Sequence, residues 1–274
     1  MSDLTTSKVK KFYEEHPYPN QIVLSKESLF EKKHTSVMKH ILSCANLCPN
    51  DLKGLSVLDA GCGTGEKSAY MALMGAEVDA FDISKTSIEI ANKNAKLLKI
   101  NVNYFQSDFA KFNSDKKYDL IIAIGTLHHT YAPKENFYRI ASHLKENGKI
   151  VVGLYNVYGR LACRVHRKLL QFGAKNPSQI IRTLKLADEK NKVRFAAVAD
   201  RFASPHESYH CIQEVLNWFE KAGVHAIASY PKTDLQNRLS IHTSQFGWLF
   251  SQTGFFFMGG EKQSFTAKNR KKGM

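Results

Sequence analysis

The sequence predicts an α/β protein built on a doubly wound, mostly parallel β-sheet. Two patterns carry this prediction: from residue 55 onward, short apolar segments alternate with segments of helical periodicity, and a glycine-rich loop follows the first apolar segment. Alternation of this kind is typical of parallel strands whose helices cover both faces of the sheet. Because ligands bind at the carboxyl ends of such strands, the functional residues are expected there.

Seven short apolar segments between polar or turn-forming stretches are expected to be the strands. They comprise residues 55–60, 77–82, 102–106, 118–124, 149–154, 224–230 and 255–260. Between several of them apolar residues recur at helical spacing, as Ile88, Ala91 and Leu98 do. On this pattern, helices are expected over residues 66–74, from residue 86, from residue 135, over 211–222 and around 241–250.

The length of 274 residues and an apolar content of 43% fit one large core, so a single main domain is expected. Residues 1–50 and 155–210 interrupt the alternation, and both are candidate caps over the sheet. We therefore expect an N-terminal cap segment over 1–50, one domain over 51–260 with an insertion at about 155–210, and a basic tail over 261–274. The tail carries Lys268, Arg270, Lys271 and Lys272.

Cysteine usage and hydropathy indicate a soluble protein of the reducing cytoplasm. The five cysteines form no CxxC pair, so neither a disulfide framework nor a metal site is predicted. The first residues lack the apolar core of a signal peptide, and no stretch approaches the ~20 apolar residues of a membrane span. The formal charge of +14 is concentrated in residues 160–194, which hold ten basic residues and two acidic ones.

Glycine, acidic and polar residues follow the first four expected strands in turn. The loop DAGCGTG at 59–65 follows the first strand, and its glycines allow a sharp turn and a close approach to a ligand. Asp82 ends the second strand, where a carboxylate can accept both hydroxyls of a ribose. Asp108 and Phe109 end the third, where an acidic acceptor beside an aromatic ring suits adenine. The fourth leads into GTLHH at 125–129, and together the four ends describe an adenosyl site.

Residues 50–154 resemble the class I S-adenosylmethionine-dependent methyltransferases, specifically those with a VLDxGCGTG loop and a GxLHHT segment. The resemblance implies a seven-stranded, Rossmann-like sheet with an antiparallel last strand, and S-adenosyl-L-methionine as the cofactor. It assigns the loop to the methionine moiety, the second strand end to ribose, the third to adenine and the fourth to the amino-acid portion. The cofactor-binding residues expected on this basis are Asp59, Gly61, Cys62, Gly63, Gly65, Asp82, Ile83, Asp108, Phe109, Ile124 and Gly125.

Two other classes of protein compete for the same loop. A nicotinamide-dependent dehydrogenase usually carries GxGxxG, and here the third glycine comes one residue early. The dehydrogenase interpretation also gives no role to Asp108 or to the His-His turn. A cofactor-binding protein without catalysis stays open, because no sequence feature excludes it.

The N-terminal segment ends in an aromatic turn flanked by prolines. Residues 8–20 read KVKKFYEEHPYPN, in which Pro17 and Pro19 disfavour further helix. The segment resembles the FYEExPYP stretch that precedes the domain in a subset of these methyltransferases, and in related enzymes such a segment folds over the cofactor. We expect Tyr13 or Tyr18 to line the pocket and help exclude water; a packed aromatic turn is the alternative.

The insertion at about 155–210 lies where class I methyltransferases usually add a substrate-covering lid. An apolar stripe at helical spacing is formed by Leu161, Val165, Leu169 and Phe172, and an adjacent face carries Arg160, Arg164 and Arg167. Three interpretations compete for this basic helix: a solvated lid face, a dock for a substrate bearing phosphate or carboxylate, and a contact with RNA or anionic lipid.

Candidate acid–base groups follow the fourth strand and end the insertion. If the acceptor is an alcohol or ammonium group, a base must remove its proton, and a histidine is suited to this. His128 is expected in this role before His129, with a structural histidine as the alternative. Residues 200–210 read DRFASPHESYH, whose pocket candidates are His206, Glu207 and Tyr209; a turn and helix N-cap is the alternative. The expected catalytic residues are therefore His128, His206 and Tyr13.

The sequence thus predicts methyl transfer to an oxygen or nitrogen atom of a small-molecule or lipid-like metabolite. RNA methylation is the first alternative, and the net positive charge of the chain favours it. Against it, the chain has GTLHH where many base-amine methyltransferases have an NPPY-type turn. Protein methylation is encouraged only by the resemblance of the N-terminal segment to repeat-bearing relatives. Neither the acceptor nor the oligomeric state follows from the sequence, and peripheral contact with a membrane stays open.

Overall fold

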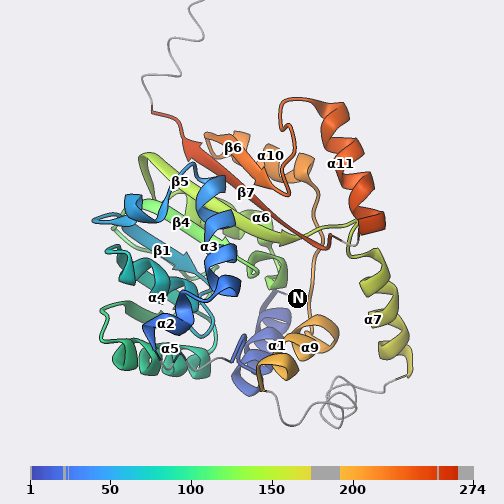
Figure 1. Cartoon of the computed structure of the whole chain (residues 1–274). Coiled ribbons are helices and arrows are strands. Elements are labelled where there is room, and N and C mark those ends of the chain that lie inside the picture. The colour runs from blue at the N-terminus through green and yellow to red at the C-terminus, as the bar shows by residue number, and fades with distance from the viewer. Residues whose placement is uncertain (1, 21–22, 24, 174–191, 252, 265–274) are drawn as a thin grey trace, which may run out of the picture.

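A computed structural model describes residues 2–20, 23, 25–173, 192–251 and 253–264. They form one seven-stranded sheet in the order β3-β2-β1-β4-β5-β7-β6, with helices on both faces (Figure 1). Strands β1 to β5 pair in parallel, and β7 runs antiparallel to both neighbours. The strands are β1 (Ser56–Ala60), β2 (Glu77–Asp82), β3 (Asn103–Gln106), β4 (Tyr118–Ile124), β5 (Leu144–Tyr155), β6 (Val224–Tyr230) and β7 (Phe255–Lys262). The predicted doubly wound, mostly parallel sheet is confirmed.

The fifth strand departs most from its expected bounds. It begins at Leu144, ahead of the expected residue 149, because the polar stretch KENG at 145–148 gave no apolar signal. Leu144 nevertheless pairs with Tyr118, through a register shift in the ladder between β4 and β5. The expected bounds of the second, fourth and sixth strands coincide with those of β2, β4 and β6.

Helices cover both faces of the sheet, which explains why β1 and β4 are almost continuously buried. One apolar layer contains α3 (Lys32–Cys44), α4 (Glu66–Leu73) and α5 (Lys85–Leu98). The opposite layer contains α6 (Pro133–Ala141), α10 (Ile212–Lys221) and α11 (Arg238–Ser251). Successive side chains of β1 pack in alternate layers: Val57 packs in the first and Leu58 in the second.

The regions expected as caps meet at the carboxyl edge of the sheet (Figure 1). Helix α1 (Ser2–Glu15) packs against α9 (Lys192–Ala203) through Phe12, Ala199 and Ala203. Two short helices, α2 (Lys26–Leu29) and η1 (Pro49–Leu52), flank α3, and α7 (Leu161–Gly173) begins the insertion. The third helix of residues 1–50, α3, belongs to the core of the sheet domain.

Helix α1 is fixed to the sheet domain by Glu14. Its carboxylate accepts the backbone N–H groups of Lys85 (2.8 Å) and Thr86 (3.0 Å) and the Thr86 hydroxyl (2.8 Å). Burial raises the pKa of Glu14, but the hydrogen bonds from Thr86 and Lys85 outweigh it and hold the pKa below its ordinary value. The first turn of α5 thus anchors α1, since a helix N-terminus favours a carboxylate.

Part of the expected basic insertion and most of the tail lie outside the described residues. They include Lys175, Arg182, Lys185 and Lys190 of the insertion and Lys268, Arg270, Lys271 and Lys272 of the tail. Among the helices within the described ranges, none is long and apolar enough to cross a membrane.

Candidate active site

A cavity of about 190 Å³ opens between α1 and the carboxyl ends of β1, β2 and β4. Its lining includes the expected cofactor-binding residues Gly61, Cys62, Gly63, Asp82, Ile83, Asp108, Phe109, Ile124 and Gly125. Helix α1 contributes Thr6, Val9 and Tyr13, and α9 contributes Asp200. Residues that follow four different strands are therefore brought to one cavity, as the alternation of elements predicted.

The glycine loop is covered by the backbone of the N-terminal segment. Gly63 has a φ of +56°, and a Cβ built on it would lie 2.3 Å from the carbonyl oxygen of Tyr18. Glycine is required here both for the left-handed backbone and for this close approach. The turn that carries Tyr18 and Pro19 therefore lies directly on the loop, and both residues line the cavity.

Asp82 holds the loop from the neighbouring strand. Its Oδ2 accepts the N–H of Gly63 at 3.0 Å, and its Oδ1 accepts the N–H of Ser84 at 2.9 Å. Burial raises the pKa of this carboxyl to about 6, and the two backbone donors oppose that shift. The carboxylate is thus a half-buried, partly satisfied acceptor in the cavity lining.

Asp59 and Gly65 stand behind the loop, outside the cavity lining. Asp59 is buried, its Oδ2 accepts a 2.6 Å hydrogen bond from the Ser68 hydroxyl on α4, and burial raises its pKa. Gly65 is the N-cap of α4, and its carbonyl accepts the Tyr104 hydroxyl at 3.1 Å. Both residues therefore shape the loop and do not face the cavity.

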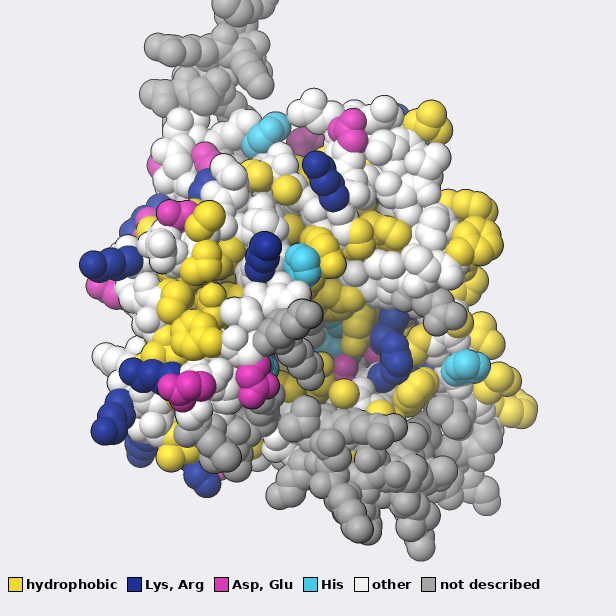
Figure 2. All heavy atoms as spheres, viewed as in Figure 1, with side chains coloured by type: hydrophobic (Ala, Val, Ile, Leu, Met, Phe, Trp, Pro, Cys, Tyr) yellow, Lys and Arg dark blue, Asp and Glu magenta, His cyan; other side chains and the backbone are white. Residues whose placement is uncertain are grey.

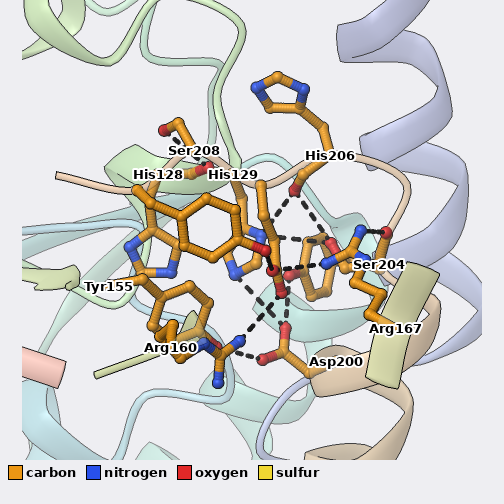
Figure 3. A network of polar contacts seen from close by, with 12 residues as sticks. His128, His129, Tyr155, Arg160, Arg167, Asp200, Ser204, His206 and Ser208 are labelled. Carbon is orange, nitrogen blue, oxygen red and sulfur yellow. Dashed lines mark hydrogen bonds and ion pairs between the residues drawn. The ribbon is translucent and has the colours of Figure 1, made fainter. Parts of the chain in front are cut away.

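A polar network joins the N-terminal segment to the insertion (Figure 3). The Tyr13 hydroxyl donates to Asp200 Oδ1 at 2.6 Å, and the Tyr155 hydroxyl donates to Asp200 Oδ2 at 3.0 Å. Burial and, after it, the charge of Asp200 raise the pKa of both phenols, so both stay protonated donors. Asp200 was not among the pocket residues expected from the sequence, although it begins the segment DRFASPHESYH; its position before the proline was the available signal.

His129 lines the cavity beside Asp200. Its Nδ1 lies 2.9 Å from the carbonyl oxygen of His206, and its Nε2 lies 3.6 Å from Asp200 Oδ1. Because a carbonyl oxygen only accepts, this contact assigns the hydrogen to Nδ1. The other ring nitrogen, Nε2, is then the atom that lies nearest to the Asp200 carboxylate.

The histidines selected from the sequence lie elsewhere. His128 is fully buried, its ring centroid lies 3.8 Å from that of Tyr155, and neither of its ring nitrogens has a hydrogen-bond partner among the residues described. Burial lowers the pKa of His128 well below the ordinary value, which keeps the ring neutral. His206 gives its carbonyl to His129, but its imidazole points away from the network (Figure 3). His129 is thus the histidine that faces the cavity.

Glu207 ties the network to α7 through buried ion pairs. Its side chain is 1% exposed and lies 3.2 Å from the guanidinium of Arg160 and 2.6 Å from that of Arg167. The Tyr209 hydroxyl donates to Glu207 at 2.6 Å, and the Arg160 guanidinium lies 3.6 Å from the centre of the Tyr155 ring. Glu207 and Tyr209 do not line the cavity, so they support the site from outside it.

A second cavity, of about 380 Å³, adjoins the first. The two cavities share Tyr18, Pro19, Lys67, Ile124, Gly125 and Asp200 in their linings. The rest of the second lining is mostly apolar and aromatic, with Val37, Met38, Tyr70, Tyr155, Phe255 and Phe257. Sequence reasoning missed it because these residues lie on helices and strands whose apolar pattern indicated only core. No cluster of three metal-ligating side chains occurs within the described parts of the chain.

The sheet topology and the cavity at its strand ends define a Rossmann-like, cofactor-binding α/β protein. A family model described as "Methyltransferase domain" matches residues 51–223, which is more than half of the chain. The protein therefore belongs to the methyltransferase-domain family.

Similar proteins carry related names. The chain is 34% identical over 107 residues to "Ubiquinone biosynthesis O-methyltransferase" of Rickettsia felis, which covers 39% of this chain and 44% of that protein. The match thus spans less than half of that relative. Magnesium protoporphyrin IX methyltransferase of Synechocystis PCC 6803 with bound SAM is 14% identical, covers 94% of this chain and 97% of its own, and has a TM-score of 0.57. The [4+2]-cyclase SpnF is 16% identical, with coverage of 96% and 94% and a TM-score of 0.54.

Proposed function

We propose that the protein is an S-adenosylmethionine-dependent methyltransferase whose acceptor is a hydroxyl oxygen or a nitrogen of a small, largely apolar molecule. The observation that carries this proposal is the meeting of two cavities at Asp200: one has the features of an adenosyl site, and the other is lined mostly by apolar and aromatic residues, with His34, Glu66 and Lys67 among them. Family membership supports the same reaction. The acceptor class rests on the second cavity and on the network around Asp200.

The residues of the first cavity fit the cofactor. The glycine loop at Gly61 and Gly63 lines the cavity, and the half-buried carboxylate of Asp82 is placed to accept ribose hydroxyls. Asp108 and Phe109 would hold the adenine amino group and ring, and Ile124 and Gly125 would lie beside the amino-acid portion. When bound, the cofactor supplies an activated methyl group on a sulfonium sulfur.

The second cavity fits the acceptor. The second cavity adjoins the first at Ile124, Gly125 and Asp200, which line both. An acceptor atom and a methyl group would meet there. Its aromatic and aliphatic walls favour a ring or hydrocarbon body, because burying such a surface is worth about 25 cal/mol per Å². Methyl transfer then depends chiefly on holding the two reactants in line.

Proton removal is assigned to His129 with Asp200. His129 lines the first cavity, so its Nε2 would take the proton of an acceptor atom that projects past Asp200 into that cavity. Asp200, which lines both cavities, lies 3.6 Å from this nitrogen. Tyr13 and Tyr155 hold Asp200 in place through its two oxygens. The name of the Rickettsia felis relative favours an oxygen acceptor over nitrogen.

The alternatives have less support. Arg160 and Arg167 are occupied by Glu207, which removes them from the proposed dock for an anionic substrate. RNA methylation is favoured only by the charge of +14. A cyclase with the same fold shows that the fold alone does not identify the reaction, so the test must follow the methyl group itself.

The proposal is tested by incubating the protein with methyl-labelled S-adenosylmethionine and, separately, an alkylphenol, the matching alkylamine and a short RNA. Label is expected in the phenol or the amine; label only in the RNA, or in none, contradicts the proposal. Val37→Trp, at the second cavity alone, should lower transfer at least about tenfold and leave cofactor affinity unchanged. Leu97→Trp, on exposed α5 surface, is the matched control and should change neither.

A further inference from the structure

Helix α7 is amphipathic, but its polar side faces inward. The side chains of Arg160, at its start, and Arg167 are buried against Glu207. The guanidinium of Arg164 lies 4.6 Å from the centre of the Tyr209 ring. The arginine face was expected to contact solvent or a ligand, but its side chains make their contacts within the protein.

The apolar stripe of α7 consequently faces solvent. Phe172 is 96% exposed and Leu169 is 64% exposed, and Leu161 and Val165 are exposed as well. A helix of a globular protein ordinarily turns such a stripe toward the core. The buried ion pairs of Glu207 hold α7 in this orientation. The exposure of the apolar stripe is therefore a consequence of the fold.

Helix α11 continues this surface. Its Phe250 is 73% exposed, and Leu239 and Phe246 are exposed on the same side at spacings of four and seven residues. The two helices meet end to end, because Asn156 donates its N–H to the carbonyl of Gly254 at 3.0 Å, between the end of α11 and the start of α7. Figure 2 shows hydrophobic side chains gathered along the edge formed by α11 and α7. We call this surface the apolar ridge: Leu161, Val165, Leu169, Phe172, Leu239, Phe246 and Phe250.

Exposed basic residues lie beside the apolar ridge. The sequences of α7 and α11 contain no Asp or Glu. Lys168 on α7 and Arg238 on α11 are exposed next to ridge residues. The whole chain carries a formal net charge of +14. An apolar surface in a basic setting is complementary to a partner that is apolar inside and anionic outside.

We propose that the apolar ridge docks the protein on an anionic phospholipid surface, with its Phe and Leu side chains inserted among the acyl chains and the basic residues at the headgroups. Exposed contiguous apolar patches mark interaction sites, and helices with aromatic and aliphatic residues beside basic ones bind in the membrane interface. Anionic lipid attracts each nearby Lys or Arg. Exposed aliphatic side chains favour lipid over RNA, and the positive charge opposes the approach of a second copy of the chain.

Vesicle sedimentation tests the docking, independently of methyl transfer. The probes are vesicles of phosphatidylcholine alone and vesicles that also contain phosphatidylglycerol. The full chain is expected to sediment with the second kind and to be released by salt. The double variants Leu169→Ser with Phe172→Ser, and Phe246→Ser with Phe250→Ser, should each weaken binding at least about tenfold. Leu97→Ser, an exposed leucine on α5, is the control and should bind as the unaltered chain does.

Folding of each variant is checked by thermal melting and by S-adenosylmethionine titration, neither of which the surface changes should alter. Three results would overturn the proposal. The first is no binding to either kind of vesicle, and the second is binding that the ridge variants leave unchanged. The third is self-association by light scattering that the ridge variants abolish without vesicle binding, which would make a second copy the partner.

Discussion

The Tyr13 hydroxyl donates a 2.6 Å hydrogen bond to Asp200 although the two residues are 187 positions apart in the chain. This bond joins α1 to α9 across the first cavity, whose lining includes both residues. The N-terminal segment and the insertion therefore close the site together.

Replacing Tyr13 by Phe removes this bond and leaves the ring in place. This bond holds α1 to α9 beside the first cavity, and a hydrogen bond to a charged group contributes about 1.5–3 kcal/mol. If the cofactor binds only when the two helices are joined, its affinity should fall about tenfold. Calorimetric titration of S-adenosylmethionine measures the effect. Tyr158→Phe, at a half-exposed tyrosine outside both cavities, should leave affinity unchanged. Equal affinity in the two variants would argue against a polar role for Tyr13.

Cofactor affinity should depend on pH through Asp82. Burial raises the pKa of this carboxyl to about 6, so it is mainly ionised above that pH and mainly protonated below it. If the ionised form binds ribose, apparent affinity should fall about tenfold between about pH 7 and about pH 5, in proportion to the ionised fraction. The Asp82→Asn variant should bind weakly at both values. A similar loss on acidification in that variant would assign the dependence to another group.

The two adjacent histidines should behave oppositely. His129→Gln removes the proposed base and should lower turnover by about 10²–10⁴-fold. His128→Leu replaces a neutral, buried ring whose nitrogens lack partners within the described ranges, so turnover should change less than about threefold and stability should not fall. Initial rates with saturating cofactor and urea unfolding measure the two effects. A large loss of turnover in His128→Leu alone would restore the assignment made from the sequence.

Glu207→Gln should destabilise the protein strongly. The change leaves the charges of Arg160 and Arg167 buried without their partner. Breaking a buried ion pair in this way reduces the free energy of unfolding by about 3–5 kcal/mol. Urea denaturation measures this change, with Glu220→Gln on the exposed face of α10 as a control expected within about 0.5 kcal/mol. A similarly small effect for both variants would show that the ion pairs do not hold α7.

Much of the cofactor cavity was predictable because its residues lie at strand ends that the local pattern reveals. The loop at 59–65, Asp82 and Asp108 each follow an apolar segment, and parallel pairing brings such ends together without further information. The same rule could not decide between the two histidines, and the role expected for His128 stays a prediction. Both lie in the short helix η2 (Leu127–His129), where one residue of offset sends one ring to the cavity and the other into the core.

Contacts between distant segments could not be predicted in the same way. The pattern of α7 showed an apolar stripe and an arginine face, but which side turns outward is decided by Glu207, which lies beyond α9. Asp200 likewise gains its importance from Tyr13 and Tyr155, far away in the chain. The second cavity joins α3, α4, β5 and β7, and no periodicity reports such a junction.

The central claim is the cofactor cavity, and calorimetric titration of S-adenosylmethionine and its demethylated product tests it most directly. We expect micromolar binding of both ligands, weakened by about 1–3 kcal/mol in Asp82→Ala, and no binding of a nicotinamide dinucleotide. Failure of both ligands to bind the unaltered protein, or binding that Asp82→Ala leaves intact, would contradict it.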